Sequence, residues 1–136
     1  MIERLLELAK NSYSPYSHFR VATIVVMKDG NSFKGVNVEN ASYGATICAE
    51  RSAILSAISI GYKKVDFKEL HCLCADSDKI STSCFACRQV ISELFDKDVN
   101  CYFYSNTGEV LKVTVEELCP YPFNEEDLKW NVDLLA

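Results

Sequence analysis

The sequence predicts an α/β fold in which helices pack against a five-stranded mixed β-sheet. The first observation behind this prediction is that apolar residues recur at helical spacing in some segments and form strand-like runs in others, in the order αββαβαββα. The second is that the segments 39–70 and 75–99 are long enough for crossover connections, so some strands are expected to pair in parallel. Both a two-layer and a three-layer arrangement satisfy this order.

The first half of the chain predicts a helix, a β-hairpin and a second helix. The hairpin is indicated by two runs on either side of Asp29-Gly30, a dipeptide typical of tight turns. Gly61 stands where the C-terminal cap of the second helix is expected. The expected elements are a helix that carries Ile2, Leu5, Leu6 and Ala9 and ends at residues 11–15, strands over residues 21–27 and 32–39, and a helix over residues 48–60.

The second half of the chain predicts a strand, a helix, two more strands and a last helix. Asn124 can cap this last helix, because Asp127 follows three residues later. The expected elements are a strand over residues 70–75, a helix over residues 84–95 that buries Val90, Ile91, Leu94 and Phe95, strands over residues 99–104 and 109–115, and a helix that begins near Asn124.

Length and charge exclude several classes of protein. The chain has 136 residues and no linker or repeat, so residues 1–136 are expected to form a single domain. A net charge of -5 argues against a nucleic-acid partner, because phosphate binding usually needs a basic face. The apolar run at residues 21–27 is too short to cross a bilayer, and the N-terminus has no signal-peptide pattern. We therefore expect a cytoplasmic protein with no membrane partner.

The seven cysteines are unusual for a small domain. A disulfide framework is not expected in a reducing compartment, which leaves packing, redox chemistry and metal binding. Cys84 and Cys87 are three residues apart at the start of a predicted helix, so both sulfurs can face one metal ion. Cys48 opens another predicted helix, and helix N-termini favour thiolates. Packing or structural roles are expected for the other four, Cys72, Cys74, Cys101 and Cys119.

Three thiolates at two helix starts can bind one Zn²⁺ and leave its fourth position for water, whose pKa then falls to about 7. Glu50 follows Cys48 by two residues and can take the proton of that water. The alternatives are a redox pair at Cys84 and Cys87 or a structural zinc module, but both leave Glu50 without a role.

The two cysteine segments carry a resemblance to a known family. Cys48-Ala49-Glu50-Arg51 and Cys84-x-x-Cys87-Arg88-Gln89-Val90 resemble the homotetrameric cytidine deaminases, whose zinc is held by three cysteines. Segments 14–19, 33–41 and 114–118 match further motifs in the same order, so the similarity runs from about residue 13 to residue 128. The resemblance implies the cytidine deaminase-like fold and a homotetramer with shared active sites.

The resemblance also implies an activity and a set of site residues. The activity is the hydrolysis of cytidine and 2′-deoxycytidine to the uridine forms and ammonia, a pyrimidine salvage reaction, with one Zn²⁺ per chain. The residues it implies are Cys48, Cys84 and Cys87 as metal ligands, Glu50 as proton shuttle, Arg51 beside the thiolates, and Phe19, Asn37, Glu39, Tyr43, Ala49 and Phe123 at the substrate.

Some of these roles also have an argument from the residues. Asn37 and Glu39, two apart on a predicted strand, are expected to share one face, opposite Val36 and Val38. A carboxylate at Glu39 would repel a 3′-phosphate, which favours a free nucleoside. Zn²⁺ with three thiolates has a formal charge of about -1, and the guanidinium of Arg51 can withdraw part of it.

The sequence departs from the family pattern at a few positions near the predicted site. Ser83 and Phe85 replace the Pro and the Gly of the family pattern Pro-Cys-Gly-Ala-Cys, and Ser83 is expected to cap the helix. Ala22-Thr23 replaces a Gly-Ala pair. A deaminase of nucleoside antibiotics stays an alternative, while a polynucleotide deaminase is disfavoured by the acidic charge. His18 is not expected to bind metal, His71 is expected in the core, and Arg88 is expected on an exposed helix face.

Overall fold

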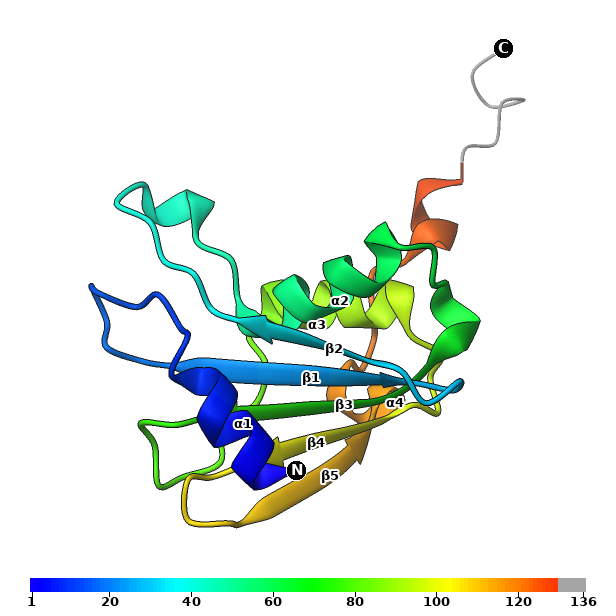
Figure 1. Ribbon diagram of the computed structural model, residues 1–136. Coiled ribbons are helices and arrows are strands. Elements are labelled where there is room, and N and C mark those ends of the chain that lie inside the picture. Colours follow the sequence, from blue (N-terminus) through cyan, green and yellow to red (C-terminus); the bar gives the residue numbers. More distant parts are fainter. Residues whose placement is uncertain (130–136) are drawn as a thin grey trace.

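A five-stranded sheet lies at the centre of the computed structural model, which describes residues 1–129 (Figure 1). The strand order is β2-β1-β3-β4-β5, and β3 pairs with β4 in parallel while the other neighbours are antiparallel. The mixed sheet predicted from the sequence is therefore confirmed. Its strands are β1 (Val21–Met27), β2 (Ser32–Val36), β3 (Phe67–Cys74), β4 (Asn100–Tyr104) and β5 (Val110–Thr114).

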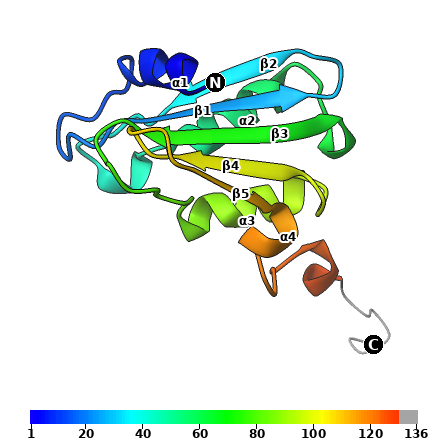
Figure 2. The same ribbon diagram turned by 90° about the horizontal axis from the view of Figure 1, so that it is seen from below.

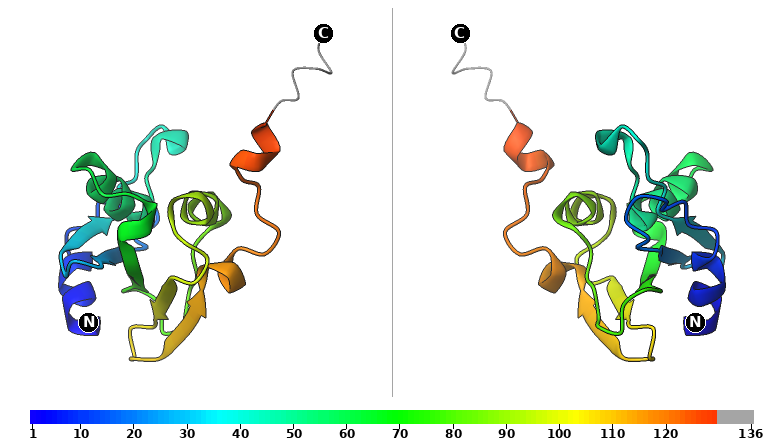
Figure 3. Two further views of the ribbon diagram at one scale, coloured as in Figure 1. Left: turned by 90° about the vertical axis from the view of Figure 1, so that its right-hand side faces the viewer. Right: turned by 90° about the vertical axis from the view of Figure 1, so that its left-hand side faces the viewer.

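Helices cover both faces of the sheet, so the described chain has three layers. Figures 2 and 3 show α1 on one side of the sheet and α2 and α3 on the other. The α-helices are α1 (Ile2–Ala9), α2 (Ala49–Ser59), α3 (Phe85–Leu94) and α4 (Val115–Leu118). Short 3₁₀ helices are η1 (Tyr43–Ala45), η2 (Lys64–Asp66) and η3 (Glu125–Leu128), and η3 stands apart from the sheet in every view.

The larger core lies between the sheet and the α2–α3 layer. It is built from apolar side chains that alternate along the strands and recur at helical spacing in the two helices, among them Val25, Leu70, Phe103, Ile54 and Ile91. The predicted apolar face of α1 is confirmed as well, because Leu5 and Ala9 are fully buried against the opposite face of the sheet. Two cores of this kind fix the sheet between its helices.

One glycine allows α2 to lie directly on β2. A Cβ atom at Gly35 would come within 2.4 Å of the backbone nitrogen of Ala53 in α2, so any side chain there would push the helix away. At the other end of α2, Gly61 has a φ of 106° and follows the helix as the sequence predicts. The position of α2 on the sheet also sets the position of Cys48, which is the N-terminal cap residue of this helix.

The structure corrects the predicted end of one strand and adds one short helix. The second strand ends at Val36 instead of residue 39, and beyond it Val38 makes only isolated bridges to Tyr13 and Ile47. The short helix α4 was not predicted, although Thr114 and Glu117 form a capping box at its start.

The last helix begins at the predicted place but is a single 3₁₀ turn. Asn124 caps it, and the Asp127 side chain accepts a hydrogen bond from the backbone N–H of Asn124. Residues 130–136 of the predicted domain lie outside the described residues. Within the part that the structure describes, no helix is long and apolar enough to cross a membrane.

Candidate active site

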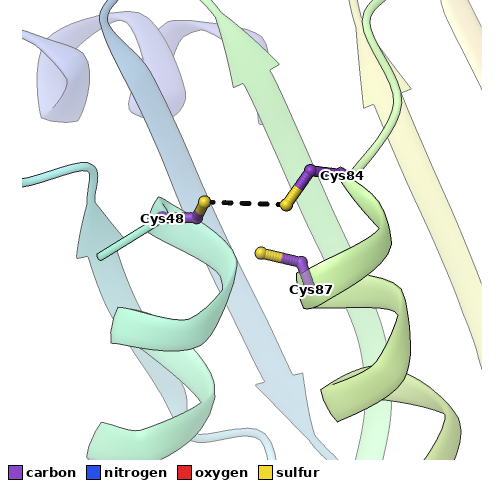
Figure 4. A group of neighbouring side chains, drawn as sticks. All are labelled: Cys48, Cys84 and Cys87. Carbon is purple, nitrogen blue, oxygen red and sulfur yellow. Dashed lines mark hydrogen bonds between the residues drawn. The ribbon is translucent and has the colours of Figure 1, made fainter. Parts of the chain in front are cut away.

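Three cysteine sulfurs meet where α2 and α3 begin side by side (Figure 4). Cys48 and Cys84 are the N-terminal cap residues of α2 and α3, and Cys87 lies in the first turn of α3. All three sulfur atoms lie within 4.8 Å of one another, and Cys48 Sγ is 3.8 Å from Cys84 Sγ. In a tetrahedral zinc site, Zn–S bonds of about 2.3 Å separate the sulfurs by about 3.8 Å. The donor set and its spacing therefore fit one zinc ion, as the sequence predicts.

The surroundings of the sulfurs favour a thiolate. A hydrogen bond with Cys87 and the guanidinium of Arg51 lower the pKa of Cys48 to about 5, although partial burial opposes them. The same hydrogen bond raises the pKa of the Cys87 thiol, so the metal-free pair shares one proton with the charge on Cys48. Arg51 Nη2 lies 3.3 Å from Cys48 Sγ, which is the contact that the charge argument predicts.

Glu50 lies beside the sulfurs without belonging to the cluster of possible metal ligands. It stands in the first turn of α2 and is only 5% exposed. Burial raises the pKa of its carboxyl, and the hydroxyl of Ser83 opposes part of this rise. A buried carboxyl with a raised pKa next to a candidate metal centre is suited to proton transfer near neutral pH.

Two cavities adjoin at this end of the molecule. The first has a volume of about 200 Å³ and is lined by two of the three candidate zinc ligands, Cys48 and Cys84. The second, of about 380 Å³, lies on the side of Glu39. Thr46 lines both. Of the predicted site residues, the first cavity brings together Phe19, Asn37, Cys48, Ala49, Glu50 and Cys84, and the second brings together Glu39 and Tyr43. Phe123 lines neither cavity.

Asn37 is buried and holds the segment before β1 in place. Its Oδ1 accepts hydrogen bonds from the backbone N–H of Val21 and from the Ser12 hydroxyl, and its Nδ2 donates to the Phe19 carbonyl at 2.7 Å. The second N–H of its amide stays available to a ligand. Asn37 and Glu39 do not belong to β2 as expected, because that strand ends at Val36.

Glu39 binds the loop that precedes β1. Its carboxylate accepts hydrogen bonds from the backbone N–H groups of Tyr16 and Ser17 and from the Ser17 hydroxyl. The hydroxyl bond to Ser17 is the main reason that the pKa of Glu39 is lowered, so this carboxylate is anionic at neutral pH. The negative charge expected at this position is therefore present.

Sequence reasoning missed that two of the expected core cysteines face the first cavity. Cys72 and Cys74 are 4% and 3% exposed, as expected for core residues, yet both line the cavity together with Ser81 and Thr82. Their position on β3 gave no sign of this, because every residue from Leu70 to Cys74 is buried, on both faces of the strand. Cys101, in contrast, is fully buried in the larger core.

Two polar residues of the α3 segment are placed differently from the prediction. Cys84, and not Ser83, is the N-terminal cap residue of α3, so the expected helix-capping role of Ser83 is wrong. Arg88 does not lie on an exposed helix face: its guanidinium donates to the carbonyls of Ser83 and Leu118 and lies 4.5 Å over the ring of Phe85. A prediction from helix periodicity misses such contacts because they join distant segments.

His71 lies in the core as expected. His71 is 6% exposed, its Nδ1 is 2.8 Å from the Tyr104 hydroxyl, and its ring stacks on Tyr102. His18 is absent from the one candidate metal cluster that residues 1–129 contain.

Comparison with known proteins identifies the family. The family described as the cytidine and deoxycytidylate deaminase zinc-binding region matches residues 1–103. A cytidine deaminase of Halalkalibacterium halodurans is 39% identical over 94% of this chain and 95% of its own length. A probable cytidine deaminase of Dictyostelium discoideum is 40% identical over 93% of this chain and 86% of its own length.

A solved structure agrees with this assignment. The crystal structure of a cytidine deaminase from Burkholderia pseudomallei is 37% identical and covers 89% of this chain and 98% of its own, with a TM-score of 0.82. Fold, sulfur cluster and sequence similarity over most of the length thus agree, and the chain belongs to the cytidine deaminase family.

Proposed function

We propose that this protein hydrolyses cytidine and 2′-deoxycytidine to uridine and 2′-deoxyuridine with release of ammonia, as a step of pyrimidine salvage in the cytoplasm. The observation that carries the proposal is the cluster of three sulfurs at two helix starts with a buried carboxyl beside it. Cys48, Cys84 and Cys87 would hold one Zn²⁺, which when bound supplies a water of lowered pKa at neutral pH.

Glu50 is the proton shuttle in this proposal. Its carboxylate takes one proton from the attacking water and delivers it to N3 of the pyrimidine. It then takes the second proton, from the hydroxyl now bonded to C4, and delivers it to the amine, which leaves as ammonia while C4 becomes a carbonyl. Burial in the first cavity raises the carboxyl pKa, which makes the protonated form accessible between these steps. The inner wall of the cavity includes Ala49 and Cys72, which are almost fully buried.

The two cavities suggest where the parts of the substrate bind. The base would occupy the first cavity, against the Phe19 ring and the backbone of Ala49, and the sugar would extend towards the second. The free N–H of Asn37 and the carboxylate of Glu39 can bind ribose hydroxyls. Because Glu39 is anionic, a nucleotide that continues through a 3′-phosphate is repelled, which favours the free nucleoside.

We further propose a homotetramer with shared active sites and D₂ symmetry. Tyr43 is 77% exposed at the rim of the second cavity, and Phe123 is 56% exposed next to the projecting turn η3. Large exposed aromatic side chains of this kind are typical of protein interfaces. In such a tetramer, Phe123 would reach the active site of a neighbouring subunit.

The decisive experiment is a substrate comparison on zinc-quantified protein. Loss of ultraviolet absorbance is recorded with cytidine, 2′-deoxycytidine, 2′-deoxycytidine 5′-monophosphate, a cytosine-containing nucleoside antibiotic and single-stranded DNA. We expect rapid turnover of the two nucleosides alone. Preferred turnover of the antibiotic would favour the second candidate, a deaminase of nucleoside antibiotics, and absence of turnover of any of these compounds by zinc-loaded protein would refute the proposal.

A further inference from the structure

Arg20 and Asp76 form an ion pair that joins two segments of the first cavity wall. Arg20 directly follows Phe19 in the chain that leads into β1, and Asp76 lies in the loop between β3 and α3. Phe19 lines the first cavity from the one segment, and Ser81 and Thr82 line it from the other. Arg20 and Asp76 themselves line neither this cavity nor the second one. The pair thus ties the two segments together from outside the site.

The ion pair includes the backbone of Arg20 as well as its side chain. Asp76 Oδ1 accepts a hydrogen bond from Arg20 Nη2 at 2.7 Å, and Asp76 Oδ2 accepts one from Arg20 Nε at 3.0 Å. Oδ2 also accepts from the backbone N–H of Arg20 at 2.8 Å, and the Arg20 carbonyl accepts from the backbone N–H of Ala75 at 2.9 Å. A partly exposed ion pair alone contributes little to stability, but a two-pronged pair that also binds the backbone fixes the geometry of the chain.

The peptide group between Phe19 and Arg20 is held at both of its polar atoms. Its N–H donates to Asp76, and its carbonyl accepts a hydrogen bond from Asn37 Nδ2 at 2.7 Å. The preceding peptide group is held too, because the backbone N–H of Phe19 donates to the Ser17 hydroxyl at 3.0 Å. The Phe19 side chain is 42% exposed, so packing holds it only in part. Since peptide groups are planar, fixing the two beside Phe19 sets the direction in which its side chain leaves the backbone.

The residue before Phe19 has an uncommon backbone conformation. His18 has a φ of 57°, in the left-handed region that residues with a side chain seldom adopt. Strained residues of this kind persist only where the surrounding contacts determine the backbone, and they cluster at ligand-binding segments. On one side of His18, its own N–H donates to the Ser14 carbonyl at 3.0 Å, and on the other side Asp76 holds Arg20. The segment that carries Phe19 is therefore fixed from both ends.

We infer that Asp76 is a positioning residue, which fixes the peptide group after Phe19 and thereby the Phe19 ring at the first cavity. Arg20 holds the Asp76 carboxylate in the orientation that this task needs. The inference rests on the proposed function, because the ring has a task only if a pyrimidine base lies against it. The ring takes no part in proton transfer, so a loss of its position should weaken substrate binding and leave the chemical step unchanged.

The first test is Asp76→Ala, measured with zinc-loaded protein and cytidine. We expect KM to rise about tenfold, the size expected for losing a hydrogen bond to a charged group, with kcat within about twofold of the parent. Asp76→Asn keeps an oxygen that can accept from the backbone N–H of Arg20, so it is expected to restore most of the parent KM. An unchanged KM in Asp76→Ala would overturn the inference even if the unfolding temperature fell, because the pair would then serve stability alone.

Glu7→Ala is the matched control. Glu7 forms an ion pair with Lys10 at 2.6 Å and lines neither the first nor the second cavity. The variant removes one carboxylate and one exposed ion pair, as Asp76→Ala does, but it leaves the peptide group after Phe19 untouched. We expect it to keep the KM and the kcat of the parent. If it raised KM as much as Asp76→Ala does, the loss of negative charge would be the cause, and the inference would fail.

The second test is the double variant, Asp76→Ala in a Phe19→Ala background. If Asp76 acts through the Phe19 ring, removing its carboxylate has no further effect once the ring is gone, so the two increases in KM do not multiply. Multiplying increases would show an independent role of Asp76 and would overturn the inference.

Hydrogen exchange of the Arg20 amide tests the same contact without catalysis. This N–H is bonded to Asp76 in the parent, so its exchange is expected to become at least about tenfold faster in Asp76→Ala. Equal exchange rates in the two proteins would overturn the inference. If the zinc-loaded parent turned over no cytidine, the proposed function would fail instead, while the exchange rates would still show whether Asp76 fixes this peptide group. The two failures are therefore distinguishable.

Discussion

The guanidinium of Arg51 donates a hydrogen bond to the sulfur of Cys48 at 3.3 Å, across the first turn of α2. The hydrogen bond to Cys48 also raises the pKa of Arg51, so the guanidinium stays charged at every pH at which the protein is folded. A zinc ion with three thiolates carries a formal charge of about -1, which makes its water a weaker acid than at a neutral site. The contact with Arg51 withdraws charge from one sulfur and offsets part of this effect.

Replacement of Arg51 by Ala is expected to keep most of the zinc and to lower kcat about tenfold, because one charge-assisted hydrogen bond to the metal centre is lost. The acidic limb of the pH profile of kcat should move to higher pH, since the bound water becomes less acidic. Zinc analysis and pH-dependent kinetics measure both effects. Arg4→Ala, at an exposed arginine of α1, is the control that should match the parent. If Arg51→Ala kept the turnover and the pH profile of the parent, the thiolates would need no guanidinium partner.

Simultaneous replacement of Cys84 and Cys87 by Ala is expected to abolish zinc binding. The remaining sulfur, Cys48, cannot hold the ion alone, because structural and catalytic zinc sites use at least three protein ligands. Elemental analysis of the purified variant gives the metal content directly. Cys101→Ala, which alters a buried cysteine of the larger core, should retain one zinc per chain if it folds. Full zinc retention in the double variant would refute the assignment of the ligands.

Sequence patterns predict best those elements whose bounds are set by residues close together in the sequence. The bounds of β1 match the prediction because its apolar run is continuous, and the starts of α2 and α3 lie within one residue of Cys48 and Cys84 as predicted. In contrast, α4 has only four residues, too few to show a period. It was recognisable only by its capping box.

The parts of the site that could not be predicted depend on contacts between distant segments. Asn37 and Glu39 were expected from the resemblance at the substrate, but their hydrogen bonds to the loop before β1 span more than fifteen residues of sequence. The hydrogen bond from Arg88 to the Leu118 carbonyl likewise joins α3 to the end of α4. No local pattern carries this information, because it depends on how the helices seat on the sheet.

His71 is expected to make the protein less stable in mild acid. Burial lowers the pKa of His71 in the folded state, and the nearby Glu69 carboxylate offsets only part of this effect. As the pH falls below about 6.5, the unfolded chain therefore binds the proton first, and stability is lost at up to about 1.4 kcal/mol per pH unit. Above that pH the contribution of His71 to stability is fully present.

Denaturant unfolding of zinc-loaded protein between pH 7.5 and 5.5 measures this dependence. His71→Phe keeps a ring that can stack on Tyr102 but cannot titrate, so the pH slope should become flatter than that of the parent. His18→Asn removes the other histidine, whose φ of 57° an asparagine tolerates, and should keep the slope of the parent. Equal slopes in the parent and His71→Phe would show that other groups cause the acid sensitivity.

If the proposed tetramer forms, Phe123→Ala is expected to weaken it and to lower activity together. The side chain lines neither cavity of its own chain, so the proposed shared active site is the route by which its loss is expected to lower turnover. Light scattering and kinetics over a range of protein concentrations measure the two effects. Val65→Ala, at an exposed apolar residue of η2, is the control. A parent protein that is active as a monomer would refute the shared-site assembly.

Glu50→Gln separates proton transfer from the rest of the site. Glutamine keeps the size of the side chain and part of its hydrogen bonding, but it cannot accept and release a proton. Because the three sulfurs and a water already complete a tetrahedral zinc site, the variant should fold, assemble and bind zinc and a substrate analogue like the parent.

The rate of the Glu50→Gln variant is expected to be at least about a hundredfold lower, since general acid–base catalysis contributes about 10²–10⁴-fold. Glu69→Gln is a suitable control, because this carboxyl lies beside His71, away from both cavities. The measurement is single-turnover deamination of cytidine by protein of known zinc content, so that slow chemistry is not confused with lost metal. The neutral amide removes the only carboxyl group among the described residues that line the first cavity. Turnover within a few-fold of the parent would make Glu50 a bystander and would require a different proton carrier.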